Sequence, residues 1–201
     1  MRGLRDGDPD AWTALYDAYS ADIWRYVGRL VGGESADVAD AVQETFLAAA
    51  RSARQFDPQR GALWGWLAGI AHNQAASYWR RIGKTARLRE RADANAVELR
   101  RWLKGDEPPD ALLERKELVD TVRCVLAELS AEHAALLTAK YLDEQSLDDL
   151  GRRFGASVEA IKSRLARARR EFRARFDSLS RETPLTVRES RNEAVWQTKR
   201  H

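Results

Sequence analysis

Large apolar residues recur at steps of three and four along most of the chain, which is the period of an α-helix that buries one face. The first such stripe covers residues 11–31 and ends at Gly32-Gly33, and a second begins at Ser35, a residue type suited to cap a helix. A third covers residues 62–81. No stretch shows the sustained alternation of β-branched and polar residues that is typical of strands. The sequence therefore predicts an all-α fold.

A polar stretch divides the predicted helices into two groups. Residues 82–112 are rich in Arg, Ala and Glu and contain Pro108-Pro109, which a continuing helix does not allow, so we interpret them as a flexible linker. Four further helices are expected at residues 113–129, 132–142, 146–154 and 158–176. We therefore predict two small helical domains, residues 1–81 and 113–176, joined by the linker 82–112 and followed by a loosely held tail, 177–201.

The C-terminal domain has the spacing of a helix-turn-helix. Ser146 stands three residues before Asp149, which approximates a capping box, and Gly155 stands where a left-handed helix cap is expected. Ser157 then caps a second helix, whose apolar stripe includes Ile161 and Leu165. In this motif the second helix enters the major groove of DNA and reads bases with its first turns.

The distribution of charge agrees with a nucleic-acid partner. The whole chain carries 34 Lys or Arg and 31 Asp or Glu, a net charge of only +3. Residues 51–104 and 151–176 are strongly basic, whereas residues 1–50 and 105–150 are strongly acidic. Basic segments attract a phosphate backbone, and acidic segments repel it but suit a basic protein surface. Charge alone does not decide between DNA contact and a merely solvated helix face.

The composition argues against several other classes of protein. No apolar run approaches the roughly 20 residues of a transmembrane helix, and the N-terminus has no apolar segment of a secretory signal, so we expect a cytoplasmic protein without membrane insertion. The single cysteine, Cys124, lies among apolar residues, so we predict that it is a core residue. No phosphate-binding glycine loop or His-Glu-x-x-His motif occurs, so we expect no enzyme activity, catalytic residue, metal or cofactor.

The basic block 51–104 also contains aromatic residues among its arginines. Bases of single-stranded DNA stack on aromatic rings while cations hold the phosphates. Trp66 shares an inward stripe with Leu67 and Ile70, so we assign it to the core. Trp64, Tyr78 and Trp79 are the better contact candidates.

Three segments together resemble the extracytoplasmic-function (ECF) sigma factors of bacterial RNA polymerase. Residues 37–46 resemble the helix that binds core polymerase, and residues 56–81 resemble the promoter-melting and −10 region. Residues 129–172, with the run from Ile161 to Arg169, are similar to the domain that binds the −35 element. The resemblance covers roughly residues 8–176 in collinear order, with two domains and a short linker.

The resemblance implies a site for each partner. The core-polymerase site, on the largest subunits, would use Asp37, Asp40, Gln43 and Glu44. The −10 site would use Phe56, Arg60, Trp64, His72, Asn73, Ser77, Tyr78, Arg80 and Arg81. The −35 site would use Ser157, Glu159, Lys162, Ser163, Arg164, Arg167, Arg170 and Arg173. The resemblance also implies an anti-sigma factor as a partner. It gives the chain the function of directing promoter-specific initiation and helping to melt the DNA.

Two alternatives and three departures accompany this interpretation. One alternative is a stand-alone helix-turn-helix repressor or activator, which would need neither the acidic helix nor the basic aromatic helix. The other is a helical adaptor that binds only protein. His72 stands where the family often has Arg, and Ser77 where it often has Asp, so the −10 base preference is not carried over. Ser130 replaces the proline that is usual between Leu129 and Glu132.

Overall fold

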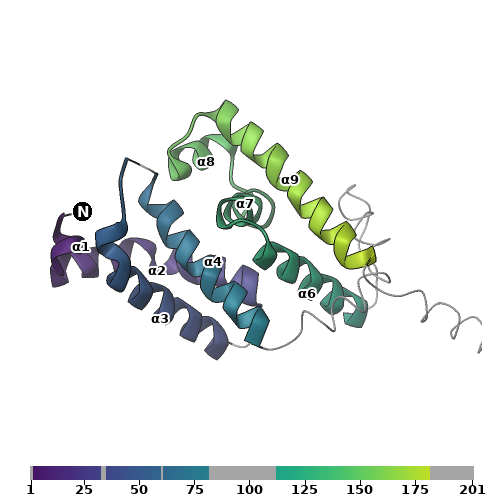
Figure 1. Ribbon diagram of the computed structural model, residues 1–201, viewed down its shortest axis with the longest axis horizontal. Helices are drawn as coiled ribbons and strands as arrows, with labels where there is room; N and C mark the ends of the chain where they lie inside the picture. Colours follow the sequence, from purple (N-terminus) through teal and green to yellow (C-terminus); the bar gives the residue numbers. More distant parts are fainter. Residues whose placement is uncertain (1, 33–34, 60, 82–111, 182–201) are drawn as a thin grey trace, which may run out of the picture.

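The computed structural model describes residues 2–32, 35–59, 61–81 and 112–181. The N-terminal half contains α1 (Arg2–Asp6), α2 (Pro9–Val31), α3 (Ser35–Ser52), the short 3-10 turn η1 (Ala53–Gln55) and α4 (Leu63–Arg81). The C-terminal half contains α6 (Leu112–Glu128), α7 (Ala131–Leu137), the π-helical turn η2 (Thr138–Leu142), α8 (Leu147–Phe154) and α9 (Val158–Arg181). Figure 1 shows helices only, and no strand occurs in the described ranges, which confirms the all-α prediction.

Local capping chemistry sets both ends of α2. The Asp8 side chain accepts a hydrogen bond from the Asp10 backbone N–H at 3.0 Å, and Pro9 occupies the first helical position. At the other end Gly32 adopts the left-handed conformation, with φ 57°, and its N–H donates to the Gly28 carbonyl at 3.0 Å. Helix α2 therefore starts two residues earlier than the apolar stripe predicts, and the sequence pattern did not predict the short α1.

The expected continuous helix over residues 132–142 is a prediction that was wrong in detail. Helix α7 ends at Leu137, and the chain continues as the wider turn η2, where the Asp143 N–H donates to the Thr138 carbonyl at 3.1 Å. At the start of α7, the Ser130 hydroxyl accepts from the His133 N–H at 3.3 Å. The serine that departs from the family pattern is thus itself a helix cap.

The predicted helix-turn-helix is confirmed. The Ser146 hydroxyl accepts from the Asp149 N–H at 3.1 Å, while the Asp149 carboxylate accepts from the Ser146 N–H, completing the capping box. Gly155 ends α8 with φ 61°, and the Ser157 hydroxyl accepts from the Ala160 N–H at 3.2 Å at the start of α9. Leu150, Phe154, Ile161 and Leu165 are buried between α8, α9 and α7.

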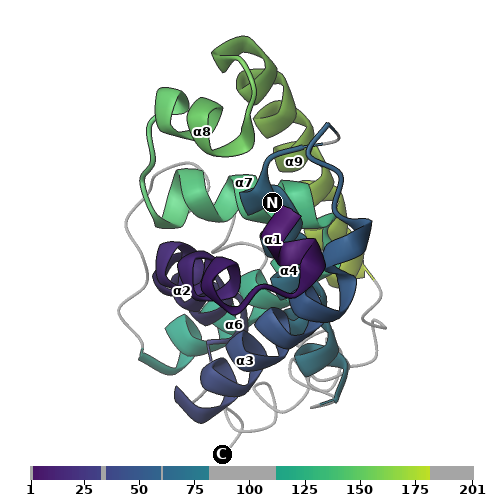
Figure 2. The ribbon, with the colours of Figure 1, turned by 90° about the vertical axis from the view of Figure 1, so that its left-hand side faces the viewer.

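The two halves pack directly against each other, which the sequence did not predict. Helix α4 contacts α2 and α3 on one side and α6 and α7 on the other, and α2 also contacts α6. Figures 1 and 2 show α4 lying between the N-terminal helices and the C-terminal ones. Buried residues of both halves therefore form one connected apolar core, from Ile23 and Leu67 to Leu136 and Ile161.

Candidate nucleic-acid and polymerase interfaces

Helix α9 presents an exposed basic face that begins at its N-terminal cap. Ile161, Leu165, Ala168 and Phe172 face the core at helical spacing, which leaves the other positions in solvent. The predicted −35 residues that the structure leaves exposed along this helix are Ser157, Glu159, Lys162, Ser163, Arg167, Arg170 and Arg173. A continuous row of cations on a well-capped helix is suited to the phosphates and base edges of a major groove.

Some of these side chains already have carboxylate or hydroxyl partners. Lys162 pairs with Glu159 at 2.8 Å, one turn away, and Arg164 pairs with Glu132 of α7 at 2.9 Å. Arg169 donates to the Tyr141 hydroxyl at 3.0 Å. Arg164 is the only one of the predicted −35 residues on α9 that is half-buried, and its pairing turns it toward α7. Arg167, Arg170 and Arg173 are exposed and have no ion pair with a described residue.

Helix α4 leaves a single narrow face in solvent. Asn73, Ser77, Arg80 and Arg81 are exposed at spacings that place them along one side of the helix. Tyr78 is half-buried, and its hydroxyl donates to the Asp37 carboxylate at 3.3 Å. Burial and the negative charge of Asp37 raise the pKa of Tyr78. Four of the predicted −10 residues therefore share one accessible surface, and Arg60 lies outside the described residues.

The expectation that Trp64 and Trp79 are available contacts is wrong for this arrangement of the chain. Trp64 is 5% exposed, and the Arg153 guanidinium of α8 lies over its ring at 3.7 Å from the centroid. Trp79 is 2% exposed and donates from Nε1 to the Leu30 carbonyl at 2.9 Å. Trp66, which the sequence assigned to the core, is half-buried and packs against the core.

His72 lies buried at the contact between the two halves. It is 4% exposed, and its Nε2 lies 3.0 Å from the Leu129 carbonyl, so Nε2 carries the proton and donates. Its Nδ1 is buried and has no hydrogen-bond partner among the described residues. Burial lowers the pKa of His72, while the bond to the carbonyl opposes that shift. The ring is therefore neutral in the folded protein near pH 7.

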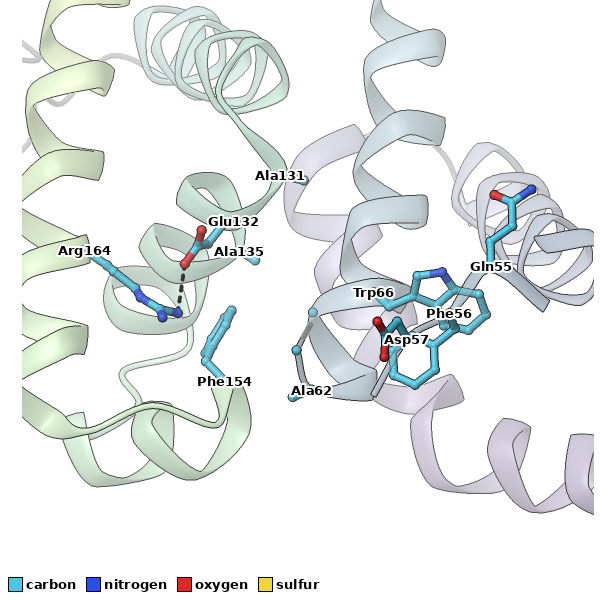
Figure 3. A pocket seen from close by; sticks show the side chains of 12 residues that line it. Gln55, Phe56, Asp57, Ala62, Trp66, Ala131, Glu132, Ala135, Phe154 and Arg164 are labelled. Atoms are coloured by element: carbon cyan, nitrogen blue, oxygen red, sulfur yellow. Dashed lines mark ion pairs between the residues drawn. The ribbon is translucent and has the colours of Figure 1, made fainter. Parts of the chain in front are cut away.

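The loop between α3 and α4 and the helix-turn-helix together enclose a pocket of about 470 Å³ (Figure 3). Phe56 and Trp66 stand on one side with their ring centroids 5.1 Å apart, beside Asp57. Phe154 and the ion-paired Arg164 and Glu132 stand on the other side. Phe56, a predicted −10 residue, is 5% exposed at this position.

The acidic residues on α3 form an exposed face opposite its buried stripe. Val38, Val42 and Ala49 are buried, whereas Asp40, Gln43 and Glu44 are exposed and Leu47 is 40% exposed beside them. Glu44 makes only a long contact with Arg51, at 3.9 Å. Asp37 is half-buried through its bond to Tyr78. An acidic face that includes an exposed apolar residue is suited to a basic protein surface rather than to DNA.

A set of ion pairs between the halves was missed by sequence reasoning. Asp22 of α2 pairs with Arg153 at 2.8 Å, and Asp143 lies 3.4 Å from Arg29 and 3.8 Å from Arg25. We call these five residues the clasp. Burial lowers the pKa of Arg153, and the charge of Asp22 opposes this shift. The partners are more than 100 positions apart in the sequence, and no local sequence motif predicts pairs at such a separation.

Two other kinds of feature are absent from the described ranges. No group of three or more His, Cys, Asp or Glu residues there is placed to hold a metal ion. Among the helices described, none combines the length and the apolar character that crossing a bilayer requires.

A capped helix-turn-helix with a basic second helix, joined to a helical half with a basic and aromatic helix, defines an all-helical DNA-binding protein. Comparison with known proteins identifies the family. Residues 15–85 match the family model of Sigma-70 region 2, and residues 120–172 match that of Sigma-70, region 4. The chain is 30% identical to the ECF RNA polymerase sigma factor SigL of Mycobacterium tuberculosis, over 83% of this chain and 89% of that protein. The chain belongs to the ECF sigma factors of RNA polymerase, which recognise promoters.

Two further relatives agree with this assignment. The chain is 34% identical to the ECF RNA polymerase sigma factor BldN of Streptomyces coelicolor over 81% of its length, and it spans 59% of the length of BldN. It is 30% identical to the ECF RNA polymerase sigma-E factor of Salmonella typhimurium, over 83% of this chain and 86% of that one. A solved structure of CnrH in complex with the cytosolic domain of CnrY is similar at 22% identity and a TM-score of 0.44, covering 88% of this chain and 94% of that one.

Proposed function

We propose that the chain divides promoter recognition between its two halves while its acidic helix binds core polymerase. The observation that carries this proposal is the presence in one chain of three separate exposed faces. They are the basic face of α9, the polar and basic face of α4 and the acidic face of α3. A stand-alone repressor needs only the first of these.

Helix α9 reads the −35 element in this proposal. Its first turns after the Ser157 cap carry Lys162, Ser163 and Arg167 on the exposed side. Arginine can donate two hydrogen bonds to guanine in the major groove, whereas arginines further along the helix meet phosphates. We assign base reading to Arg167 and phosphate contact to Arg170 and Arg173.

Helix α4 and the loop before it contact the −10 element. The exposed Asn73 and Ser77 offer hydrogen-bonding groups, and Arg80 and Arg81 offer charge at the C-terminal end of the same face. Trp66, which is partly exposed and lines the pocket beside Asp57, provides a ring on which an unpaired base can stack, and the buried Phe56 packs against that ring.

The exposed residues of α3 bind the core enzyme. Asp40 and Glu44 lie one turn apart, and Gln43 lies beside them. Their partner would be a basic surface on the largest subunits of polymerase. The same assignment places the protein in the cytoplasm with polymerase and makes an anti-sigma factor its expected antagonist.

The experiment that tests these roles is run-off transcription with purified core polymerase. The variant Asp40→Lys with Glu44→Lys is expected to lose transcription because it no longer retains core in a pull-down, while circular dichroism stays unchanged. The matched control, Asp6→Lys with Asp17→Lys, makes the same change of charge at exposed positions on α1 and α2 and keeps activity. Unchanged core affinity of the α3 variant would refute its role. Symmetric operator binding without core would favour the stand-alone repressor.

A further inference from the structure

Tyr141 is an exposed aromatic residue that none of the sites described so far includes. It stands in the π-helical turn η2 with 47% of its surface exposed, and its hydroxyl oxygen accepts a hydrogen bond from Nη1 of Arg169 on α9 at 3.0 Å. Within the described ranges, Arg169 is the hydrogen-bond partner of this hydroxyl. The Tyr141 O–H is therefore free to donate to an acceptor outside the chain, and the exposed Arg169 keeps its remaining N–H donors.

The turn η2 holds Tyr141 in place. The Asp143 N–H donates to the Thr138 carbonyl across the turn at 3.1 Å. The Lys140 ammonium donates to the Gln145 carbonyl at 3.0 Å, just beyond the turn. Because the turn is held from both ends, Tyr141 and its arginine partner form a pair before any ligand arrives, and binding orders them at a lower entropic cost.

One edge of α9, beside its buried stripe, is partnered by α7. The Arg164 guanidinium pairs with Glu132 at 2.9 Å, and the Glu171 carboxylate bonds to Nδ1 of His133. Both partners stand in the first turn of α7, which begins after the Ser130 cap. These contacts attach α9 to α7 and place two carboxylates on this edge, so it attracts a polyanion only weakly.

The opposite edge of α9 keeps its positive charge. Its cations follow one another at helical spacing and are Lys162, Arg169 and Arg173. Lys162 pairs with Glu159, whereas the two arginines have no carboxylate partner within the described ranges. Asp143, which follows Tyr141 closely in the sequence, is held by the arginines of the clasp instead. The Tyr141 hydroxyl therefore lies beside a cationic edge.

We propose that Tyr141 and Arg169 form a phosphate clamp on promoter DNA, separate from the residues of α9 that face the base edges. The Tyr141 O–H donates to one oxygen of a backbone phosphate, and the Arg169 guanidinium donates to another oxygen of the same phosphate. Contacts of this kind carry no sequence information but fix the register and orientation of a helix in the groove. This inference rests on the proposed function, in which α9 binds the −35 element.

The chemistry of this edge favours a phosphate over a protein surface. Exposed aromatic residues and arginines are also common in protein interfaces. A row of cations, however, would need a matching acidic surface on a protein, whereas DNA presents a negative charge about every 1.7 Å along its axis. Docking of this edge on core polymerase is the other outcome that the test distinguishes.

Promoter binding by holoenzyme at several salt concentrations tests the clamp. The probe is the duplex of a promoter that the wild-type holoenzyme transcribes. Tyr141→Phe removes only the hydroxyl and should weaken binding about threefold to tenfold, with the slope of log affinity against log salt concentration unchanged. Arg169→Ala should weaken binding about tenfold and lower that slope by about one. The double variant should lose less than the product of the two single losses, because each donor holds the other in place.

Matched controls remove the same groups elsewhere. Tyr16→Phe removes a hydroxyl from an exposed tyrosine of α2, and Arg175→Ala removes an exposed cation from the opposite edge of α9. Both should keep promoter affinity within about twofold of the wild type. Circular dichroism should be the same for the controls and the clamp variants, which separates loss of a contact from loss of the fold.

A neutral phosphate analogue tests the contact directly. Methylphosphonate replaces the phosphates of the −35 element one at a time, which removes the charge of each in turn. Wild-type holoenzyme should lose affinity when the clamped phosphate is replaced. At that position Tyr141→Phe and Arg169→Ala should lose little more, because the contact is already broken in each variant.

The outcomes are distinct. Equal sensitivity of the variants and the wild type to every methylphosphonate would overturn the clamp, and so would wild-type promoter affinity of both variants. Weaker retention of core by the variants in a pull-down, with normal methylphosphonate sensitivity, would assign this edge to polymerase and also overturn the clamp. Failure of wild-type holoenzyme to bind any −35 element would contradict the proposed function as well, whereas normal promoter binding without a clamp effect contradicts the clamp alone.

Discussion

Replacing Gly32 with alanine tests the capping of α2 and its contact with the C-terminal half in a single step. Gly32 has φ 57°, a left-handed conformation that costs a residue with a Cβ about 1–2 kcal/mol. The new Cβ would also lie 1.9 Å from Cζ of Arg123, a residue of α6. Arg123 must then move away from the end of α2, where its positive charge faces the carbonyl groups of the helix terminus.

The expected magnitude follows from these two costs and one gain. Alanine lowers the entropy of the unfolded chain and so returns about 0.4–1 kcal/mol. Arg123 also makes an ion pair with Asp120 at 3.3 Å, and its displacement disturbs that partly exposed pair for at most about 1 kcal/mol. We therefore expect Gly32→Ala to lower the free energy of unfolding by about 1–2 kcal/mol.

Urea denaturation followed by circular dichroism measures this loss. Gly28→Ala is the matched control, because it lies in the same helix with no atom within 4 Å of its new Cβ, and alanine in a helix interior should stabilise the protein by about 0.5–1 kcal/mol. A second control, Gly32→Ala with Arg123→Ala, removes the clash and keeps the backbone strain. If Gly32→Ala proved neutral or stabilising while Gly28→Ala behaved as expected, the assignment of the left-handed cap would be refuted.

Three further predictions concern the site and its supports. Arg167→Ala should cost roughly 1–3 kcal/mol of promoter binding by holoenzyme and relax the sequence preference at one base pair. Arg173→Ala should weaken binding to all −35 sequences alike and reduce the slope of log affinity against log salt concentration by about one. An equal loss of affinity on every sequence for Arg167→Ala would contradict its role in reading a base. Because burial lowers the pKa of His72, the unfolded state binds a proton more readily, so the free energy of unfolding should fall as pH drops below about 6.5 towards the lower folded pKa. In urea denaturation at pH 7.5 and 5.5, the free energy of unfolding of His72→Gln should depend less on pH than that of the wild type. An equal pH dependence in both proteins would show that His72 is not its source. Ser146→Ala removes the capping box of α8 and should lower the free energy of unfolding by about 1 kcal/mol, with thermal denaturation of Asp148→Asn, which leaves the box intact, as the comparison.

The parts of the fold that depend on local chemistry could be predicted from the sequence. Ser146 and Gly155 fix the ends of α8 through contacts within five residues, so their pattern was sufficient. The π-helical turn η2 was missed because the apolar period hardly changes when one turn widens. Contacts such as Arg153 with Asp22, which are 131 positions apart, leave no pattern in either segment.

The deeper burial of Trp64 compared with Trp66 has a related physical cause. The apolar surface of the first turns of α4 covers nearly half of the helix circumference, through Leu63, Trp64, Trp66, Leu67 and Ile70. The two tryptophans lie at the opposite edges of this arc, so either one can face inward. The choice depends on α4 being covered on two sides, by α2 and α3 and by α6 and α7. A prediction that treats the N-terminal half alone cannot include the packing of α6 and α7 against α4.

The side of α4 that contacts the C-terminal half carries two of the residues that the resemblance assigns to the −10 element. Arg153 lies over the ring of Trp64, and His72 donates to the Leu129 carbonyl, so groups of the C-terminal half help to bury both side chains. The ring of Trp64 also packs against Tyr26 of α2, with the ring centroids 6.1 Å apart. Asn73 and Ser77, on the adjacent face, stay exposed. Without these contacts α4 would still pack against α2 and α3, and Trp64 against Tyr26. The burial of Trp64 and His72 therefore depends on both halves, and a prediction from residues 56–81 alone could not include it.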